Sequence, residues 1–186
     1  MRVEMAKELR GTGVEFGAGT NPFPVPAHCN IIYADRNSSE ELAARDYFAG
    51  QGTVPSHIQT DIAEMEGIAE SSVDFIIGSH VIEHTPNPIK ALRNAYRNLR
   101  TGGRLLLVVP DKNVTFDKGR GLTSLDHLIA DYEMPSRERD FEHYVEFFRL
   151  CFPQPDPIAS ARMIWERGDD VHFHTWTYES FGELIA

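Results

Sequence analysis

The sequence predicts an α/β domain in which a parallel sheet carries helices on its faces. Short apolar runs alternate with longer amphipathic runs over residues 1–110, as strands and crossover helices do. At 186 residues and 41% hydrophobic, the chain is long enough to bury one substantial core and short for two. We therefore expect a single domain over residues 1–186.

Five short segments are the candidate strands of this sheet. Glycine, proline or polar residues bound each of them and interrupt regular structure there. They lie at 14–16 (VEF), 30–35 (NIIYAD), 57–61 (HIQTD), 73–79 (VDFIIGS) and 103–110 (GRLLLVVP).

Two amphipathic segments in the same region are the candidate helices. The segment 38–50 (SSEELAARDYFAG) begins with serine and acidic residues, which suit a helix N-terminus, and closes at Gly50. The segment 87–103 (NPIKALRNAYRNLRTGG) has Pro88 near its start and an apolar helical face. That face comprises Ile89, Leu92, Tyr96 and Leu99.

The linker between the first two strands is short and carries Pro22, Pro24 and Pro26. A full crossover helix hardly fits there, because proline removes backbone donors and few residues are left. We expect a short turn or a single helical turn in its place.

After Pro110 the pattern becomes helical. Helices are expected at 123–133, 137–151 and 158–168, and then an extended segment, 171–177, leads into a last helix with Thr177 as N-cap. Four aromatic residues at helical spacing belong either to a core or to a lid over a substrate. They are Phe141, Tyr144, Phe147 and Phe148.

Charge and hydropathy exclude several classes of partner. The net charge of -10 and pI near 5.2 disfavour nucleic acid, because phosphate neutralisation needs clustered Lys and Arg. No stretch approaches the roughly 20 apolar residues of a membrane-spanning helix, and the N-terminus (MRVEMAKELRG) lacks the apolar middle of a secretory signal. We expect a cytoplasmic protein with no membrane partner; the sequence does not predict its oligomeric state.

The loop after the first strand (GAGTNPFP, 17–24) is a candidate ligand site. Gly17 and Gly19 let the main chain approach a ligand closely, since no Cβ stands in the way. Asp35 ends the second strand, where an acidic side chain in a nucleotide-binding sheet accepts hydrogen bonds from ribose hydroxyls. Asp61 ends the third strand, within reach of an adenine edge.

The order and spacing of these strand ends resemble a known family. VEFGAG, YAD, QTDI, DFIIGSHVIEH and LRTGGRLLLVVP follow one another as they do in the class I S-adenosylmethionine-dependent methyltransferases. The resemblance covers residues 13–111. It is most specific in the H-V-I-E-H-x-x-x-P turn after the fourth strand and in the L-R-x-G-G entry to the fifth.

The resemblance implies a Rossmann-like doubly wound parallel sheet in the order 3-2-1-4-5, with a helical insertion after strand five. Residues 1–111 would be the cofactor-binding core, 112–176 the insertion covering the substrate and 177–186 the start of a final helix. The C-terminal antiparallel hairpin of the family is missing from the sequence, and we expect that the chain is truncated.

The resemblance also assigns roles to individual residues. The implied cofactor is S-adenosylmethionine. Its methionine part would lie against Glu15, Gly17, Ala18 and Gly19. Asp35 would bind the ribose beside Arg36, Asp61 and Ile62 would flank the adenine, and Ser79 and His80 would lie at the amino group and the reactive methyl.

Methyl transfer from a sulfonium is an in-line displacement, so it needs positioning and, for some acceptors, a base. His80 is the candidate base by its position, although His80 and His84 also have a purely structural interpretation. We expect a small-molecule or carbohydrate acceptor. The segment 111–133 resembles bacterial methyltransferases joined to sugar-transferring proteins, which favours carbohydrate weakly.

The run VHFHTWT (171–177) also suggests a metal site, because His172 and His174 lie on one face of an extended segment. Further ligands would be His127, His143 or Asp170. Two ligands do not make a site, so we predict no metal and expect His174 and Trp176 to line the substrate pocket.

Two other functions remain open. A non-catalytic S-adenosylmethionine-binding module would keep the glycines and aspartates yet show no turnover. A nicotinamide-dependent oxidoreductase would need a helix N-terminus for its pyrophosphate, where this chain has Asn21 and Pro22.

Overall fold

The structure is a computed structural model that describes residues 1–45 and 50–186. The chain divides into two compact units. The first unit comprises Met1–Ile82 and Lys90–Val108, and the second comprises Glu83–Ile89 and Val109–Ala186. The sequence analysis ended the core at residue 111; in the structure Glu83–Ile89 also belong to the second unit.

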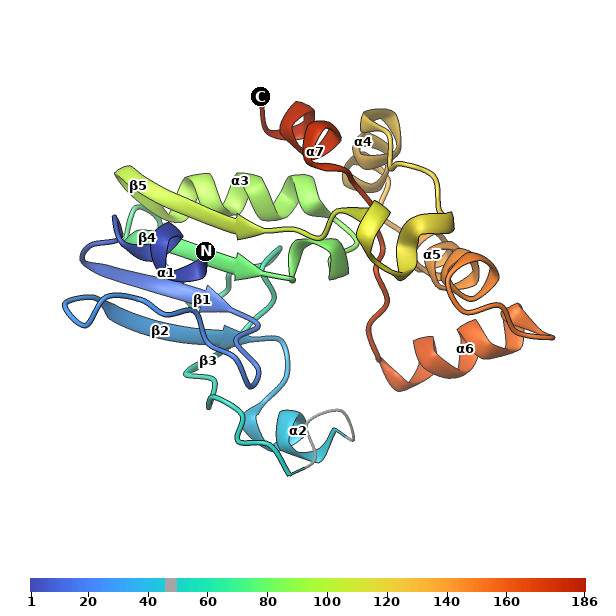
Figure 1. Cartoon of the computed structure of the whole chain (residues 1–186), viewed down its shortest axis with the longest axis horizontal. Helices are drawn as coiled ribbons and strands as arrows, with labels where there is room; N and C mark the ends of the chain where they lie inside the picture. The colour runs from blue at the N-terminus through green and yellow to red at the C-terminus, as the bar shows by residue number, and fades with distance from the viewer. Residues whose placement is uncertain (46–49) are drawn as a thin grey trace. The chain divides into compact units, whose positions relative to one another are not determined.

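A five-stranded sheet forms the first unit, with all pairings parallel and the order β3-β2-β1-β4-β5 (Figure 1). The predicted fold class is thereby confirmed. The elements are α1 (Arg2–Ala6), β1 (Thr12–Phe16), β2 (Asn30–Asp35), α2 (Ser39–Ala44), β3 (Ile58–Gln59), β4 (Val73–Ser79), α3 (Pro88–Asn98) and β5 (Leu99–Val108).

The central strands are buried on both faces, as expected for a parallel sheet covered by helices. Along β4, Ile76 belongs to a core cluster that includes Ala91 and Ala95 of α3. Phe75 and Ile77 belong to a second cluster that includes Ala6 of α1. Because successive side chains of a strand point to opposite faces, α3 and α1 pack on opposite sides of the sheet.

Several elements differ from the sequence prediction. The fifth strand spans Leu99–Val108 instead of 103–110, so residues assigned to the end of the preceding helix belong to the sheet. The third strand has only two residues, Ile58–Gln59, instead of five. The helix expected over 38–50 is helical at Ser39–Ala44 and extended at Arg45, and residues 46–49 lie outside the described part of the chain. A short N-terminal helix, α1, was not predicted.

The helix expected over 87–103 ends at Asn98, and its predicted apolar face is half-buried except at one residue. Tyr96 was placed on that face but is 87% exposed. Ala91 and Ala95, spaced by four residues, are buried in its place. Small side chains let a helix lie close to a sheet, whereas the bulky apolar positions stay at its margin.

The linker over residues 17–29 contains no helix, as predicted from its prolines. Its main chain is held by short turns, among them the bond from the Asn21 amide to the Ala18 carbonyl at 3.0 Å. No helix N-terminus therefore follows β1.

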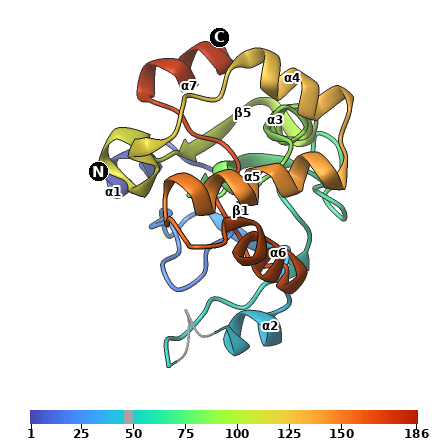
Figure 2. The same cartoon turned by 90° about the vertical axis from the view of Figure 1, so that its right-hand side faces the viewer.

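The second unit is helical, and its longer helices match the predicted ones to within two residues, whereas two short helices within residues 112–119 were not predicted. In both views α5 lies between α4 and α6 (Figures 1 and 2). The second unit begins inside the short helix η2 (Ile82–His84), at Glu83. Its other elements are the short helices η3 (Lys112–Val114) and η4 (Phe116–Gly119) and the helices α4 (Leu125–Glu133), α5 (Arg137–Leu150), α6 (Pro157–Arg167) and α7 (Tyr178–Ile185). Thr177 caps α7, as predicted.

The extended segment 171–177 runs through this unit and is hydrogen-bonded to several of its parts. The Phe173 amide donates to the Glu83 carbonyl at 2.7 Å, and the Thr175 hydroxyl donates to the Gly121 carbonyl at 2.6 Å. Lys112 donates its amide to the Trp176 carbonyl at 2.9 Å.

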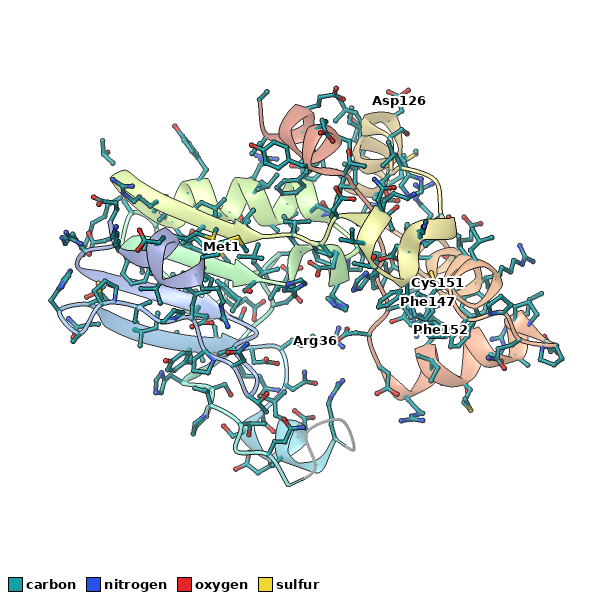
Figure 3. The ribbon with its side chains drawn as sticks, in the orientation of Figure 1. Met1, Arg36, Asp126, Phe147, Cys151 and Phe152 are labelled. Atoms are coloured by element: carbon teal, nitrogen blue, oxygen red, sulfur yellow. The ribbon has the colours of Figure 1, made fainter. Side chains whose placement is uncertain are left out.

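Aromatic side chains of α5 take part in the core, as one of the two predicted interpretations requires. Tyr144 is buried against Phe173, and Phe141, Phe147 and Phe148 pack at the margin of the same cluster. Phe147 also contacts Phe152, which follows α5 (Figure 3).

A buried arginine connects several of these parts. The Arg120 side chain is 1% exposed and donates to Asp117 at 3.0 Å and to Glu146 at 2.7 Å. It also donates to the carbonyls of His172 at 2.7 Å and Phe173 at 2.9 Å. A guanidinium offers five donors in a fixed plane, so one side chain satisfies all these acceptors.

Within residues 1–45 and 50–186 we find no helix with the length and apolar character that crossing a membrane requires.

Candidate functional site

The carboxyl ends of the strands lie along one edge of the sheet because all pairings are parallel. In register, Phe16 of β1 faces Ala34 of β2 on one side and Gly78 of β4 on the other. The residues that follow these positions are Gly17, Asp35 and Ser79. The structure therefore brings the ends of three strands together as predicted from the sequence.

Both glycines of the loop after β1 adopt left-handed backbone conformations, with φ of +64° at Gly17 and +53° at Gly19. The Gly17 amide donates to the Ala34 carbonyl at 3.0 Å, which fixes the loop to β2. Gly17 is exposed at the edge of the sheet, while Ala18 and Gly19 are half-buried. Main chain without a side chain is thus presented where a ligand would lie.

Gly17 cannot carry a side chain without displacing its neighbour. A Cβ built there would lie 2.7 Å from Cγ2 of Val81, well inside van der Waals contact. Val81 follows His80 after the end of β4, and the sequence analysis gave it no role. The only sequence feature that could have indicated a role for Val81 is its position inside the H-V-I-E-H turn.

Glu15 of β1 is 1% exposed, and its side chain binds the 17–24 loop. Its two carboxylate oxygens accept from the Phe23 amide at 2.8 and 3.0 Å. The side chain thus reaches the far end of the 17–24 loop. The contact that the structure shows for Glu15 is one that shapes the loop.

The environment of Glu15 makes loop stability depend on pH. Burial raises the pKa of Glu15 to about 7 from 4.5, although the Phe23 hydrogen bond and the Arg2 charge oppose the rise. The folded chain therefore keeps a proton between these pH values that the unfolded chain releases. The stabilisation is complete below pH 4.5 and is lost as the pH rises through 7, on the order of 3 kcal/mol in total.

We expect Glu15→Gln to remove this pH dependence, since the amide keeps an acceptor for Phe23 but does not titrate. Urea unfolding at pH 5 and pH 8 measures the effect as the difference between wild type and variant. Glu70→Gln, whose exposed side chain pairs with Arg97, serves as the control and should behave like wild type. Equal pH dependence in wild type and Glu15→Gln would contradict the assignment.

Asp35 ends β2 with a half-buried, oriented carboxylate. Its Oδ1 accepts from the Asn37 amide at 2.9 Å and from the Asn37 side chain at 3.0 Å. Such a turn fixes the carboxylate at the edge of the sheet. Arg36, between Asp35 and Asn37 in the sequence, lies at the same edge of the sheet (Figure 3). Sequence reasoning missed Asn37, although the Asp-x-Asn spacing signals this turn.

Asp61 and Ile62 follow β3 and differ in what they present. Asp61 accepts from the Ala63 amide at 2.7 Å and begins a turn. The Ile62 side chain is 3% exposed and packs in the core cluster that also contains Val14 and Ile76. A ligand at this edge would therefore meet the main chain of Ile62.

Ser79 and His80 lie at the end of β4. Ser79 pairs in register with Val108, and the His80 amide donates to the Val108 carbonyl at 2.9 Å. His80 is exposed and has a φ of +58°, which costs a non-glycine residue about 1–2 kcal/mol. Strain of this kind is enriched where a side chain must be aimed at a ligand.

His174 and Trp176, the predicted substrate residues, belong to the second unit and are each 1% exposed. A pocket of about 260 Å³ in that unit is lined by the alternate residues Phe173 and Thr175, together with His127 and His143. His174 and Trp176 are not among its lining residues. Their role toward a substrate stays a prediction.

Comparison with protein families identifies the domain to which the carboxyl edge of this sheet belongs. A family model described as a methyltransferase domain matches residues 2–167. The chain belongs to this family. The resemblance found in the sequence is therefore confirmed, and the parallel sheet in the order 3-2-1-4-5 is that of a methyltransferase domain.

Solved structures support the fold of the methyltransferase domain. A methyltransferase candidate from Bacillus halodurans is 18% identical over 99% of this chain and 64% of its own, with a TM-score of 0.53. The YcgJ protein from Bacillus subtilis is 19% identical over 98% and 63%, with a TM-score of 0.52. A SAM-dependent methyltransferase from Thermotoga maritima is 20% identical over 99% and 67%, with a TM-score of 0.51.

These structures are longer than this methyltransferase domain, which spans about two thirds of their length. Comparison with curated protein sequences gives no match.

Proposed function

We propose that this methyltransferase domain binds S-adenosylmethionine at the carboxyl edge of its sheet and transfers the methyl group to a small molecule or a sugar. One observation carries the proposal most directly. The exposed, left-handed main chain of Gly17 and the half-buried Asp35 lie at neighbouring strand ends. Bare main chain suits the amino-acid part of the cofactor, and a carboxylate suits its ribose.

The chemistry of this edge fits a cationic nucleoside better than a dinucleotide. The linker after β1 has no helix, so no helix N-terminus is available for a pyrophosphate. S-adenosylmethionine carries no phosphate, and its sulfonium is compatible with neighbouring acidic groups. The nicotinamide alternative is correspondingly disfavoured.

S-adenosylmethionine, when bound, supplies an electrophilic methyl group. The residues of this chain would position and deprotonate the acceptor. Asp35 would hold the ribose hydroxyls, and the 17–19 loop would hold the amino-acid end. His80 would accept the proton from the acceptor's hydroxyl or amine on a ring nitrogen, as general bases near neutral pH do.

A small-molecule or carbohydrate acceptor is proposed because the net charge of -10 disfavours a polyanionic one. A cytoplasmic location belongs to the same proposal. Turnover with any acceptor would separate this function from that of a non-catalytic binding module.

We expect Asp35→Asn to weaken S-adenosylhomocysteine binding by roughly 10-fold or more, since hydrogen bonds to a charged group contribute about 1.5–3 kcal/mol. The amide keeps an Oδ1 acceptor for Asn37, so the turn should survive. Titration calorimetry measures the affinity of S-adenosylhomocysteine and of NAD for wild type and variant.

Glu70→Gln is the matched control, because it removes the same charge from an exposed position in the first unit. It should bind S-adenosylhomocysteine like wild type. Tight NAD binding, or an affinity for S-adenosylhomocysteine unchanged by Asp35→Asn, would refute the proposed site.

A further inference from the structure

Three histidines that are far apart in the sequence meet inside the second unit. His127 comes from α4, His143 from α5 and His174 from the segment 171–177. One ligand atom from each lies within 4.8 Å of the other two. We call these residues the three-histidine cluster. Histidine nitrogen is the most common protein ligand for zinc-like metals.

A carboxylate completes the cluster. Asp131 lies one helical turn after His127 and is 5% exposed. Its Oδ2 lies 3.1 Å from Nε2 of His127, 3.8 Å from that of His143 and 4.0 Å from that of His174. In a tetrahedral zinc site with bonds of 2.0–2.1 Å, neighbouring ligand atoms are roughly 3.3 Å apart. Nε2 of His174 also contacts the Pro86 carbonyl at 3.3 Å, so this ring would bind an ion either through Nε2 after turning from that carbonyl or through Nδ1.

The same carboxylate oxygen has no hydrogen bond within the part of the chain that the structure describes. Its contact with His127 has the distance of an ion pair but not the angles of a hydrogen bond. Nδ1 of His174 is likewise buried without a hydrogen bond among the described residues. Buried polar atoms without partners are costly and rare, so two of them in one cluster require an explanation.

The second oxygen of Asp131 is firmly held. Its Oδ1 accepts from Nε of Arg139 at 2.9 Å and from Nη2 at 2.5 Å. Metal-binding carboxylates are commonly oriented in this way by a second partner. Arg139 thus acts as a positioning residue and leaves Oδ2 directed at the histidines.

The cluster is also accessible from outside. His127 and His143 line the pocket of about 260 Å³ in this unit, and the His127 side chain is 43% exposed. An ion can therefore enter without unfolding the helices, which a metal site requires.

We propose that His127, His143, His174 and Asp131 bind one zinc-class divalent ion in the second unit. Four protein ligands leave no open position, which is the arrangement of structural zinc sites. The ion would connect α4, α5 and the segment 171–177. This inference departs from the sequence analysis, which predicted no metal, and it does not depend on the proposed methyltransferase activity.

The unit contains a second histidine cluster. Glu83, His84 and His172 also offer ligand atoms within 4.8 Å of one another. Nδ1 of His172 is hydrogen-bonded to Asp117 at 2.6 Å, and Nδ1 of His84 contacts the Val171 carbonyl at 3.1 Å. A protein partner on one ring nitrogen leaves the other nitrogen for a metal, so the test below includes a variant of this cluster.

The test is titration of the full chain, prepared without a polyhistidine tag and treated with chelator, with ZnCl2 or CoCl2. We expect one ion per chain, a higher melting temperature with Zn²⁺, and the visible absorption of tetrahedral Co²⁺. His127→Ala should reduce Zn²⁺ affinity more than about 100-fold, since even changes behind a ligand cost roughly 10–100-fold. It should also abolish the melting shift.

His127 is half-exposed, so this variant should fold, and its circular dichroism should match wild type. His143→Ala is the second ligand variant, and His28→Ala, in the first unit, is the control that keeps wild-type affinity. No binding to wild type, or equal binding by wild type and His127→Ala, would overturn the proposal. So would loss of binding in His172→Ala with His127→Ala unaffected, which would assign the ion to the other cluster.

Discussion

Replacing Arg120 with alanine should destabilise the second unit by about 3–5 kcal/mol, the usual cost of breaking a buried ion pair by removing one partner. The guanidinium is 1% exposed and bonds Asp117, which is itself 2% exposed. Without it, that carboxylate stays buried with one partner fewer, and the carbonyls of His172 and Phe173 lose their donor. Each of these losses is expensive because water cannot easily replace the arginine.

The same network affects Asp117. Burial alone would raise the pKa of Asp117, but hydrogen bonding and charge from His172 and Arg120 lower it below its usual value. Its contribution to stability is therefore present above the unfolded pKa and is lost as the pH falls through the folded one. Arg120→Ala should weaken this acid dependence as well as the overall stability.

Urea unfolding of wild type and variant, followed by tryptophan fluorescence and circular dichroism, measures the effect. Trp165 and Trp176 both lie in the second unit, so fluorescence reports on it. Arg167→Ala is the matched control, because its exposed pair with Asp169 should contribute less than about 1 kcal/mol. A loss at Arg120 no larger than the loss at Arg167 would show that the buried network does not stabilise the unit.

Most of the sheet was predictable because its signals are local. β2 and β4 have the predicted bounds, since polar residues such as Arg36 after β2 and Ser72 before β4 delimit the apolar runs. β3 was overestimated because it is an edge strand with one neighbour, paired only at Ile58 and Gln59. Beyond it, the Thr60 side chain accepts from the Glu66 amide and turns the chain away.

Helix faces were less predictable, because the identity of the packing partner decides them. In α3 the apolar pattern pointed to Tyr96, but the sheet buries Ala91 and Ala95 instead. By hydrophobicity alone, Tyr96 is a plausible buried residue. The narrow space between helix and sheet admits the small alanines instead, and the hydrophobic periodicity of the sequence carries no information on that space.

The histidines of the second unit show the same limit. The alternation in VHFHTWT predicted that His172 and His174 share one face of an extended segment and could reach one ion. Yet His172 pairs with Asp117 while His174 meets α4 and α5, and these partners are distant in the sequence. The one local signal was the spacing of His127 and Asp131 by four residues on the predicted helix 123–133.

The glycine at the end of β1 gives the prediction with the largest effect on ligand binding. We expect Gly17→Ala to reduce S-adenosylhomocysteine affinity by roughly 30-fold or more. A left-handed conformation costs a residue with a Cβ about 1–2 kcal/mol, and overpacking against Val81 adds about 1–3 kcal/mol. In the free variant the loop would move to relieve this strain. Ligand binding would then have to bring the loop back to the strained conformation, and the strain energy would be subtracted from the binding free energy.

A double variant separates the two contributions. Val81→Ala removes the side chain that the new Cβ would meet at 2.7 Å, so Gly17→Ala with Val81→Ala should recover part of the affinity. The remaining loss measures the cost of the +64° φ. Gly102→Ala is the control, because Gly102 has a φ of +80° but a Cβ at that position would meet nothing within 4 Å among the described residues. It should lose stability and keep affinity; if Gly17→Ala behaved in the same way, the main chain of the 17–19 loop would not be the surface that holds the ligand.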